Sequence, residues 1–187
     1  MESEFLRLCR ARKSVRRFAD RLVEREKIGL CLEAARRAPS ADNLQPWRFV
    51  VFDDPQKKAR LADAAFRGAY ALSRRLANAP VLVCLLIKEH TLVNKVAGAV
   101  QGTQWQLVDA GIGGEHFVLA ATEQGLGTCW IGWYDGRALI REMGLRGRGY
   151  RPVAIIALGY PAADVSFNER PRKSLSDIAY WNEPPRH

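Results

Sequence analysis

The sequence predicts a single folded domain over residues 1–187, of the α/β or α+β class. Three observations support this prediction. The chain has 187 residues and is 48% hydrophobic, which is enough to bury a substantial core. Segments with helical spacing of apolar residues alternate with short apolar runs typical of strands, without a linker or an internal repeat. No run of about 18 uncharged apolar residues occurs, so we expect no membrane-spanning helix.

Apolar residues at helical spacing predict helices over 3–12 and 24–37. The second helix should end before Pro39, because proline disfavours the helical conformation in the residue that precedes it. Beyond the loop expected over 39–46, the same reasoning predicts a strand at 47–54, a helix capped by Asp54 and running to about Phe66, a strand at 80–88, a helix over 93–124, a strand at 125–132, a short helix at 135–145 and a strand at 151–161.

Two of these segments carry further information. The run at 80–88 is apolar throughout, which indicates a strand buried on both faces of a central sheet. The helix at 93–124 contains Gly111, Gly113 and Gly114, each of which costs about 1 kcal/mol relative to alanine. We therefore expect another helix, from this chain or from a second subunit, to approach this one closely.

Cysteines and histidines show no pattern typical of a metal site. The four cysteines (Cys9, Cys31, Cys84 and Cys129) are scattered through apolar segments, without the short spacings of zinc sites or redox pairs. The three histidines are far apart in the sequence. We expect buried free thiols and no metal.

The chain is basic, with a net charge of +9, which attracts anions such as phosphorylated cofactors, nucleic acid or acidic membrane surfaces. Its basic residues are interleaved with acidic ones, as on a mixed helical surface. A nucleic-acid-binding module is one alternative, although neither an RNA-binding motif nor a recognition helix is evident. The N-terminus has no apolar segment typical of a secretory signal, so we expect a cytoplasmic protein.

Common nucleotide-binding and hydrolase motifs are missing. The segment GIGGEH (111–116) departs from the dinucleotide-binding pattern because its last residue is His116, and no Gly-Lys pair is present for a phosphate-binding loop. A nucleophile elbow of the form G-x-S-x-G is also absent. These observations disfavour a Rossmann dehydrogenase, a P-loop ATPase and a serine hydrolase.

Five segments, each weak alone, occur in a specific order: RKSVRRF (12–18), APSADNLQPWRFVV (38–51), GLGTCWIGW (125–133), ALGYP (157–161) and ERPRKSL (169–175). In this order and spacing the chain resembles the nitroreductase family of FMN-dependent oxidoreductases. The resemblance implies an α+β fold with a central, mostly antiparallel sheet flanked by helices. It also implies an interlocked homodimer with two FMN sites at the subunit interface, with the extension at 162–187 docking on the partner subunit.

The resemblance gives the segment RKSVRRF (12–18), which we call the basic segment, a role in holding FMN. Arg12 and Ser14 match residues that bind phosphate and ribityl oxygens, and Lys13 lies where it can reach the phosphate. Arg16 matches a basic residue near N1 and O2 of the flavin, where a cation stabilises the reduced form. The alternative is that these cations only line the end of a helix; Arg17 is expected to be a surface charge.

The loop at 39–46 carries further candidates. The resemblance implies that the backbone of Pro39, Ser40 and Ala41 faces the flavin, and that Asn43 offers a donor and an acceptor to its pyrimidine edge. Gln45 is a further candidate cofactor contact. In the family this loop reaches the FMN bound largely by the other subunit. The alternative for Asn43 is an ordinary turn residue.

Two other segments complete the expected cofactor site. Trp130, Ile131 and Gly132 match a strand end whose backbone approaches the flavin ring, including an amide near N5. Arg172 and Lys173 resemble a basic pair that closes over the phosphate. The alternatives are a plain buried strand with tryptophans that serve packing, and solvated charges on the tail.

The resemblance implies hydride transfer from NADH or NADPH to FMN and then to a small acceptor, such as a nitroaromatic, a quinone or an enone. No side chain is expected to act as a catalytic group. Residues 66–106 should shape the acceptor pocket, with Tyr70 and Trp105 as candidate lids. The alternatives are other flavin chemistries on the same fold, namely flavin fragmentation and reductive dehalogenation.

Overall fold

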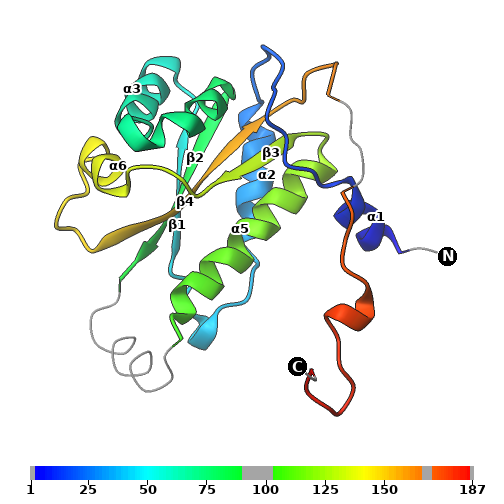
Figure 1. Ribbon diagram of the computed structural model, residues 1–187. Helices are drawn as coiled ribbons and strands as arrows, with labels where there is room; N and C mark the ends of the chain where they lie inside the picture. Colours follow the sequence, from blue (N-terminus) through cyan, green and yellow to red (C-terminus); the bar gives the residue numbers. More distant parts are fainter. Residues whose placement is uncertain (1–2, 90–102, 166–169, 186–187) are drawn as a thin grey trace.

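The computed structural model describes residues 3–89, 103–165 and 170–185. Its centre is a four-stranded sheet with the order β1-β2-β4-β3. The strands are β1 (Trp47–Phe52), β2 (Val81–Lys88), β3 (Gly127–Ile131) and β4 (Tyr150–Gly159). All neighbouring strands are antiparallel, and helices cover both faces of the sheet (Figure 1). This arrangement confirms the predicted α+β fold with a central antiparallel sheet.

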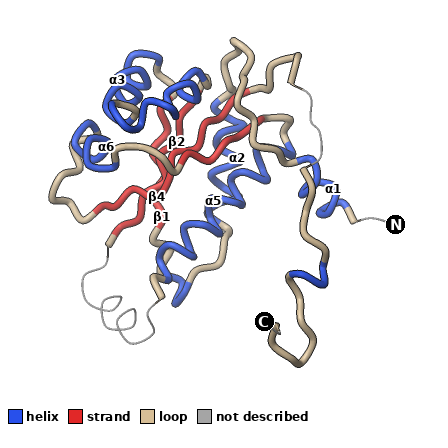
Figure 2. The backbone as a smooth tube through the Cα atoms, viewed as in Figure 1, coloured by secondary structure: helices blue, strands red, loops and turns tan. Residues whose placement is uncertain are grey.

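Two helical layers enclose the sheet, as Figure 2 shows. On one face lie α2 (Arg25–Arg36) and α5 (Trp105–Glu123), and on the other lie α3 (Pro55–Ala65) and α6 (Gly136–Glu142). Alternate residues of β2 serve the two layers: Leu82 and Cys84 face α3 and α6, whereas Val81 and Val83 face α2. The strand is therefore buried on both faces, as its uninterrupted apolar run predicts.

The ends of the helices follow the sequence signals. Asp54 caps α3 by accepting a hydrogen bond from the Lys57 amide at 2.8 Å, and Asp135 caps α6 in the same way. Gly125, at φ 74°, takes the left-handed conformation beyond the end of α5. The first ten residues of the helix predicted over 93–124 lie outside the described residues. The structure adds a 3-10 helix, η2 (Gly68–Asn78), to which sequence analysis assigned no element.

The prediction that another helix approaches α5 closely is confirmed for α2, which packs against it, but not at the glycines Gly113 and Gly114. Gly113 and Gly114 are approached by the indole rings of Trp47 and Trp130, which come from β1 and β3, rather than by another helix. A Cβ on Gly113 would lie 3.2 Å from the Trp47 ring, and one on Gly114 would overlap Trp130. The small residues are needed because two large rings stand between the sheet and the helix. Among the described residues, none has an atom within 4 Å of the Cβ position of Gly111.

The chain ends lie away from the sheet. The first helix, α1 (Glu4–Ala11), contacts α5, and the tail with its short 3-10 helix η3 (Leu175–Asp177) extends past α1 (Figure 1). Residues 170–185 are exposed. Among the described residues, no helix is both long and apolar enough to cross a bilayer.

Candidate functional site

The basic segment lies against the open edge of β3, the last strand of the sheet. The Val15 amide donates a hydrogen bond to the Thr128 carbonyl at 2.8 Å, and Ser14 forms a parallel bridge with Thr128. The Val15 side chain is buried above Gly127, where a Cβ would lie only 2.6 Å from it. The glycine thus permits the segment to approach β3 closely, and Val15 fixes the backbone between the flanking cations.

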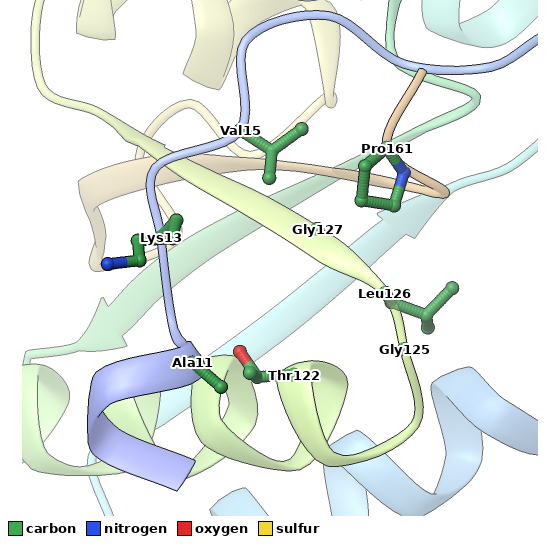
Figure 3. A pocket seen from close by; sticks show the side chains of 8 residues that line it. All are labelled: Ala11, Lys13, Val15, Thr122, Gly125, Leu126, Gly127 and Pro161. Atoms are coloured by element: carbon green, nitrogen blue, oxygen red, sulfur yellow. The ribbon is translucent and has the colours of Figure 1, made fainter. Parts of the chain in front are cut away.

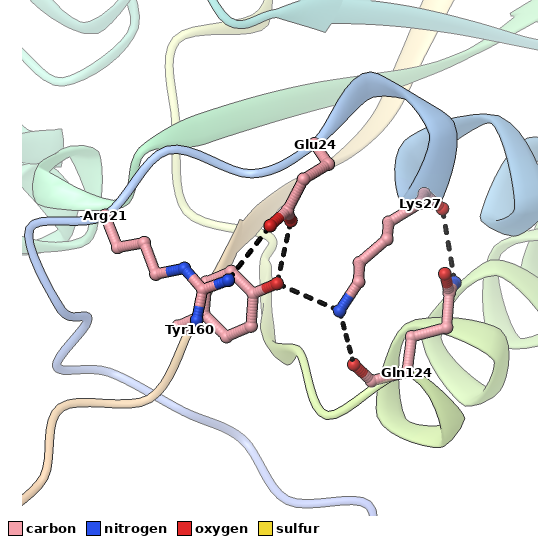
Figure 4. A network of polar contacts seen from close by, with 5 residues as sticks. All are labelled: Arg21, Glu24, Lys27, Gln124 and Tyr160. Atoms are coloured by element: carbon pink, nitrogen blue, oxygen red, sulfur yellow. Dashed lines mark hydrogen bonds and ion pairs between the residues drawn. The ribbon is translucent and has the colours of Figure 1, made fainter.

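A polar network fixes the far end of this segment (Figure 4). The Tyr160 carbonyl accepts a hydrogen bond from the Ala19 amide at 2.8 Å, and the Tyr160 hydroxyl donates to Glu24 Oε2 at 2.7 Å. The Lys27 ammonium donates both to the Tyr160 hydroxyl, at 2.9 Å, and to the Gln124 carbonyl, at 3.2 Å. The Tyr160 hydroxyl is the main cause that lowers the pKa of Glu24 to about 2.

Cations gather beside β3, and sequence analysis missed one of them. The Arg12 guanidinium lies 3.7 Å from a carboxylate oxygen of Glu115. Arg16 donates to the Ser14 carbonyl at 3.3 Å and has no acidic partner in the described parts of the chain. Burial raises the pKa of the Cys129 thiol, and the charges of Arg16 and Arg75 oppose that rise, so both cations lie near this residue of β3. Arg75 comes from η2, and no sequence motif connects it with Arg16.

A small cavity lies between the basic segment and the C-terminal end of α5 (Figure 3). Its volume is about 170 Å³, and Lys13, Val15 and Gly127 are among the lining residues. Cavities that hold cofactors usually measure about 300–1,000 Å³. This cavity is therefore too small to enclose a flavin. Pro161 and Leu126 line the side of the cavity opposite Lys13, and the Lys13 amine points away from them (Figure 3).

At the end of β3 the backbone and the side chains have different roles. The Ile131 side chain is buried, and the Trp130 ring lies over Gly114 of α5, as expected for packing residues. Polar groups alternate between the two edges of a strand. Because the Thr128 carbonyl points away from β4, the Trp130 amide two residues later points to the same open edge. The backbone is thus available to a ligand there, while the Trp130 ring packs against α5.

Gly132 opens onto a larger cavity of about 860 Å³. Tyr70 of η2 lines this cavity, and its ring lies 5.3 Å from the ring of Trp133. The Trp133 indole donates a hydrogen bond to the Ala69 carbonyl at 2.8 Å, which joins η2 to the segment after β3. The remaining lining residues follow β2, continue from Gly132 into α6 or begin β4: Glu89, Tyr134, Asp135, Gly136, Arg137, Ile140, Tyr150, Arg151 and Pro152.

The loop after α2 lies near the N-terminal end of α5, whereas the basic segment lies near its C-terminal half (Figure 1). Within the loop is a 3-10 helix, η1 (Ala41–Asn43), and its residue Ala41 donates a hydrogen bond to Asp109 of α5 at 3.1 Å. Pro39 and Asn43 are exposed, and Ser40 and Gln45 are half-buried. The single chain therefore does not bring this loop together with the basic segment.

Arg172 and Lys173 are exposed on the tail, and neither forms a hydrogen bond or an ion pair with the described residues. Their predicted contact with phosphate stays a prediction. Among the described residues, no group of three or more metal-binding side chains is close enough to hold a metal ion.

Comparison with known proteins identifies the family. The family model described as "Nitroreductase family" matches residues 9–160, a stretch that runs from α1 to the residue after β4. The chain belongs to the nitroreductase family. The match includes the basic segment, the loop at 39–46 and the end of β3, so all predicted contacts before the tail lie within it.

Relatives of this nitroreductase family member carry different names. An NADH dehydrogenase from Thermus thermophilus is 31% identical over 82% of this chain and 84% of its own length. An iodotyrosine deiodinase from Haliscomenobacter hydrossis is 25% identical over 94% of this chain and 87% of its own length. The family is thus shown, whereas the names of its members point to more than one reaction.

Solved structures agree with the fold. A nitroreductase family protein from Clostridium novyi has a TM-score of 0.73 and 30% identity, covering 86% of this chain and 87% of its own. A protein from Exiguobacterium sibiricum, solved in complex with FMN, has a TM-score of 0.79 and 23% identity over 97% of this chain and 99% of its own. At that identity the second comparison supports the fold alone.

Proposed function

We propose that this protein is an FMN-dependent oxidoreductase that uses NADH or NADPH to reduce nitroaromatic, quinone or related small acceptors. The observation that carries the proposal is the basic segment held along the open edge of β3, where Arg16 and Arg75 have no carboxylate partner within the described residues. Bound FMN would supply hydride transfer between the nicotinamide donor and the acceptor.

The residues at β3 suit the chemistry of FMN. Arg12, Lys13 and Ser14 would bind the phosphate and the ribityl oxygens, since cations and hydroxyls are preferred partners of phosphate. Arg16 would place its charge beside the pyrimidine ring, and the Trp130 amide would donate to the flavin ring. Arg75 joins this set as a second cation near Cys129. The chain's own contribution is orientation and charge, without a nucleophile.

Exposed apolar side chains support a homodimer. They occur on α1 (Phe5 and Leu6), on α5 (Trp105, Leu107 and Val108) and on the tail (Leu175, Ile178 and Trp181). Large exposed apolar patches mark interaction surfaces. A second subunit on α5 would cover this face and Gly111. It would also bring its own loop at 39–46 to the basic segment, which completes a cofactor site that the 170 Å³ cavity alone cannot provide.

The cavity of about 860 Å³ is our candidate for the acceptor pocket, because Gly132 connects it with the end of β3. Tyr70 and Trp133 provide aromatic surface beside it, which suits a flat aromatic acceptor. Tyr70 was a candidate lid from sequence analysis, and its position next to Gly132 supports that assignment.

A second candidate reaction is reductive dehalogenation by the same cofactor. The observation that favours it is the match to an iodotyrosine deiodinase over 94% of this chain. Both reactions need FMN and the same cations, so the acceptor decides between them.

The test is a comparison of acceptors. Purified protein loaded with FMN is mixed with NADH or NADPH and then with a nitroaromatic, a quinone or iodotyrosine. Turnover of the first two acceptors supports our proposal, and release of iodide from iodotyrosine as the faster reaction would replace it with the second candidate. Charge reversal at Arg16 and Arg75 should weaken FMN binding, whereas reversal at Arg146, outside the site, should not.

A further inference from the structure

The loop between α2 and β1 contains an unusual concentration of left-handed backbone. Asp42, Asn43 and Gln45 have φ angles of 51°, 54° and 45°, although none is a glycine. Asparagine and aspartate tolerate this region better than other residues, whereas glutamine has no such advantage. Conformations of this kind persist only where surrounding contacts enforce them, and they cluster at functional sites.

Several hydrogen bonds enforce the conformation. The Gln45 amide donates to Ser40 Oγ at 3.0 Å, and the Gln45 side chain donates to Asn43 Oδ1 at 2.8 Å. These two bonds lie within the loop itself. The bond from the Ala41 amide to Asp109 Oδ1, at 3.1 Å, instead attaches the loop to α5. Asp109 therefore sets where the loop lies, while the internal bonds set its shape.

Burial of the Asp109 carboxylate at this position lowers the stability of the fold. The residue is 3% exposed, and its second oxygen, Oδ2, has no hydrogen-bond partner among the described residues. A buried carboxylate with an unsatisfied oxygen destabilises the fold, and an apolar side chain would serve packing better. Its neighbour Ala110 is fully buried in the apolar core. The carboxylate thus has a purpose other than packing, and the Ala41 amide is the group that it holds.

We propose that Asp109 is a positioning residue for the cofactor site, acting through the loop Ser40–Gln45. By holding the Ala41 amide, it places Asn43 against the FMN held by the Arg12–Arg16 segment of the partner subunit. The inference rests on the proposed function, since it requires FMN and a dimer. It predicts that FMN affinity at one site depends on Asp109 of the other subunit.

The first test compares two substitutions in the full-length protein. Asp109→Ala removes the acceptor, whereas Asp109→Asn retains an oxygen of the same position and shape. For Asp109→Ala we expect at least tenfold faster amide hydrogen exchange at residues 41–45, and FMN affinity weakened about tenfold to hundredfold, as for loss of a hydrogen bond to a charged group. Asp109→Asn should restore both to within about threefold of the wild type.

Control variants separate positioning from general destabilisation. Ile155→Val shortens a fully buried side chain on β4, away from the loop, and should lower the melting temperature without changing FMN affinity. Equal loss of affinity in Asp109→Ala and Ile155→Val would overturn the proposal, as would failure of Asp109→Asn to restore binding while it folds normally.

If Asp109→Ala does not fold, the variant Ala41→Pro tests the same hydrogen bond. Ala41→Pro removes the donor instead of the acceptor and leaves α5 untouched. Proline is tolerated at the first position of a helix, and Ser40, at φ −145° and ψ 154°, already has a conformation allowed before proline. We expect weakened FMN binding in Ala41→Pro, and wild-type affinity in that variant would contradict the proposal.

Mixed dimers test the action across the interface. Subunits carrying Asp109→Ala and Arg16→Glu are co-expressed with different tags, and the mixed dimer is purified. If Asp109 serves the partner's site, one site contains both changes and the other contains neither, so one FMN per dimer should bind with wild-type affinity. Loss of every such site would overturn the inference. A wild-type protein that binds no FMN would instead contradict the proposed function itself.

Discussion

Gly127→Ala is the substitution whose effect the structure defines most closely. A Cβ at this position would lie 2.6 Å from Val15 Cγ2 and 2.7 Å from Val15 Cβ. Carbon atoms in contact prefer at least about 3.5 Å, so the basic segment would have to move away from β3 by about 0.9 Å. The Val15–Thr128 hydrogen bond, now 2.8 Å, would then exceed normal hydrogen-bond length.

The expected cost combines two effects. Overpacking together with loss of one hydrogen bond should destabilise the fold by about 1.5 to 4.5 kcal/mol. For a chain of this size, that corresponds to a fall in melting temperature of about 3 to 18 °C. Because Arg12, Ser14 and Arg16 move with Val15, we expect FMN affinity to weaken about tenfold or more.

The assay measures melting temperature by calorimetry and FMN affinity by quenching of flavin fluorescence. Gly29→Ala is the matched control, since Gly29 lies in α2 and no atom of the described parts of the chain is within 4 Å of its Cβ position. That variant should bind FMN normally and be slightly more stable, because alanine favours a helix over glycine. Unchanged stability and affinity in Gly127→Ala would refute the close contact between the basic segment and β3.

Three further predictions follow from other parts of the structure. A Cβ added by Gly111→Ala meets no atom of the described residues, so this substitution should stabilise a monomer as Gly29→Ala does. Dissociation of the protein in size-exclusion chromatography would instead locate the subunit contact on α5. The pKa of Glu24 is lowered to about 2, so the contribution of Glu24 to stability is complete above pH 4.5 and is lost as the pH falls toward 2. Tyr160→Phe should raise the pKa of Glu24, as measured by NMR titration, and make the acid dependence of unfolding shallower. Tyr70→Ala should raise KM for an aromatic acceptor while FMN affinity stays unchanged. An equal loss of acceptor binding and of FMN affinity would contradict the assignment of the acceptor cavity.

Much of the fold follows from local signals in the sequence. Pro39, Asp54 and Gly125 mark the ends of helices that the structure confirms, because caps and breakers act over a few residues. The uninterrupted apolar run at 80–88 predicts the buried strand β2 equally directly. The partners of Gly113 and Gly114 were not predicted, since which ring meets a helical glycine depends on how the sheet packs against α5.

The candidate site was only partly predictable, because some of its contacts join residues that are distant in the sequence. The segment from Arg12 to Arg16 has a local motif, and the structure places it along β3, whereas its contact with FMN stays a prediction. Arg75 and Asp109 have no motif of their own, and each gains significance only through a contact distant in sequence. A lone arginine or aspartate in a helical segment is normally read as a surface charge, which is why both were missed.

The measurement that tests the central claim most directly is the visible absorption spectrum of the purified protein, before and after anaerobic addition of NADH and then NADPH. Our account predicts a yellow protein with flavin bands that either nucleotide bleaches, and one FMN for each chain in a dimer. A colourless protein that takes up no added FMN would contradict the account, and the cations beside β3 would then have to bind a different anion.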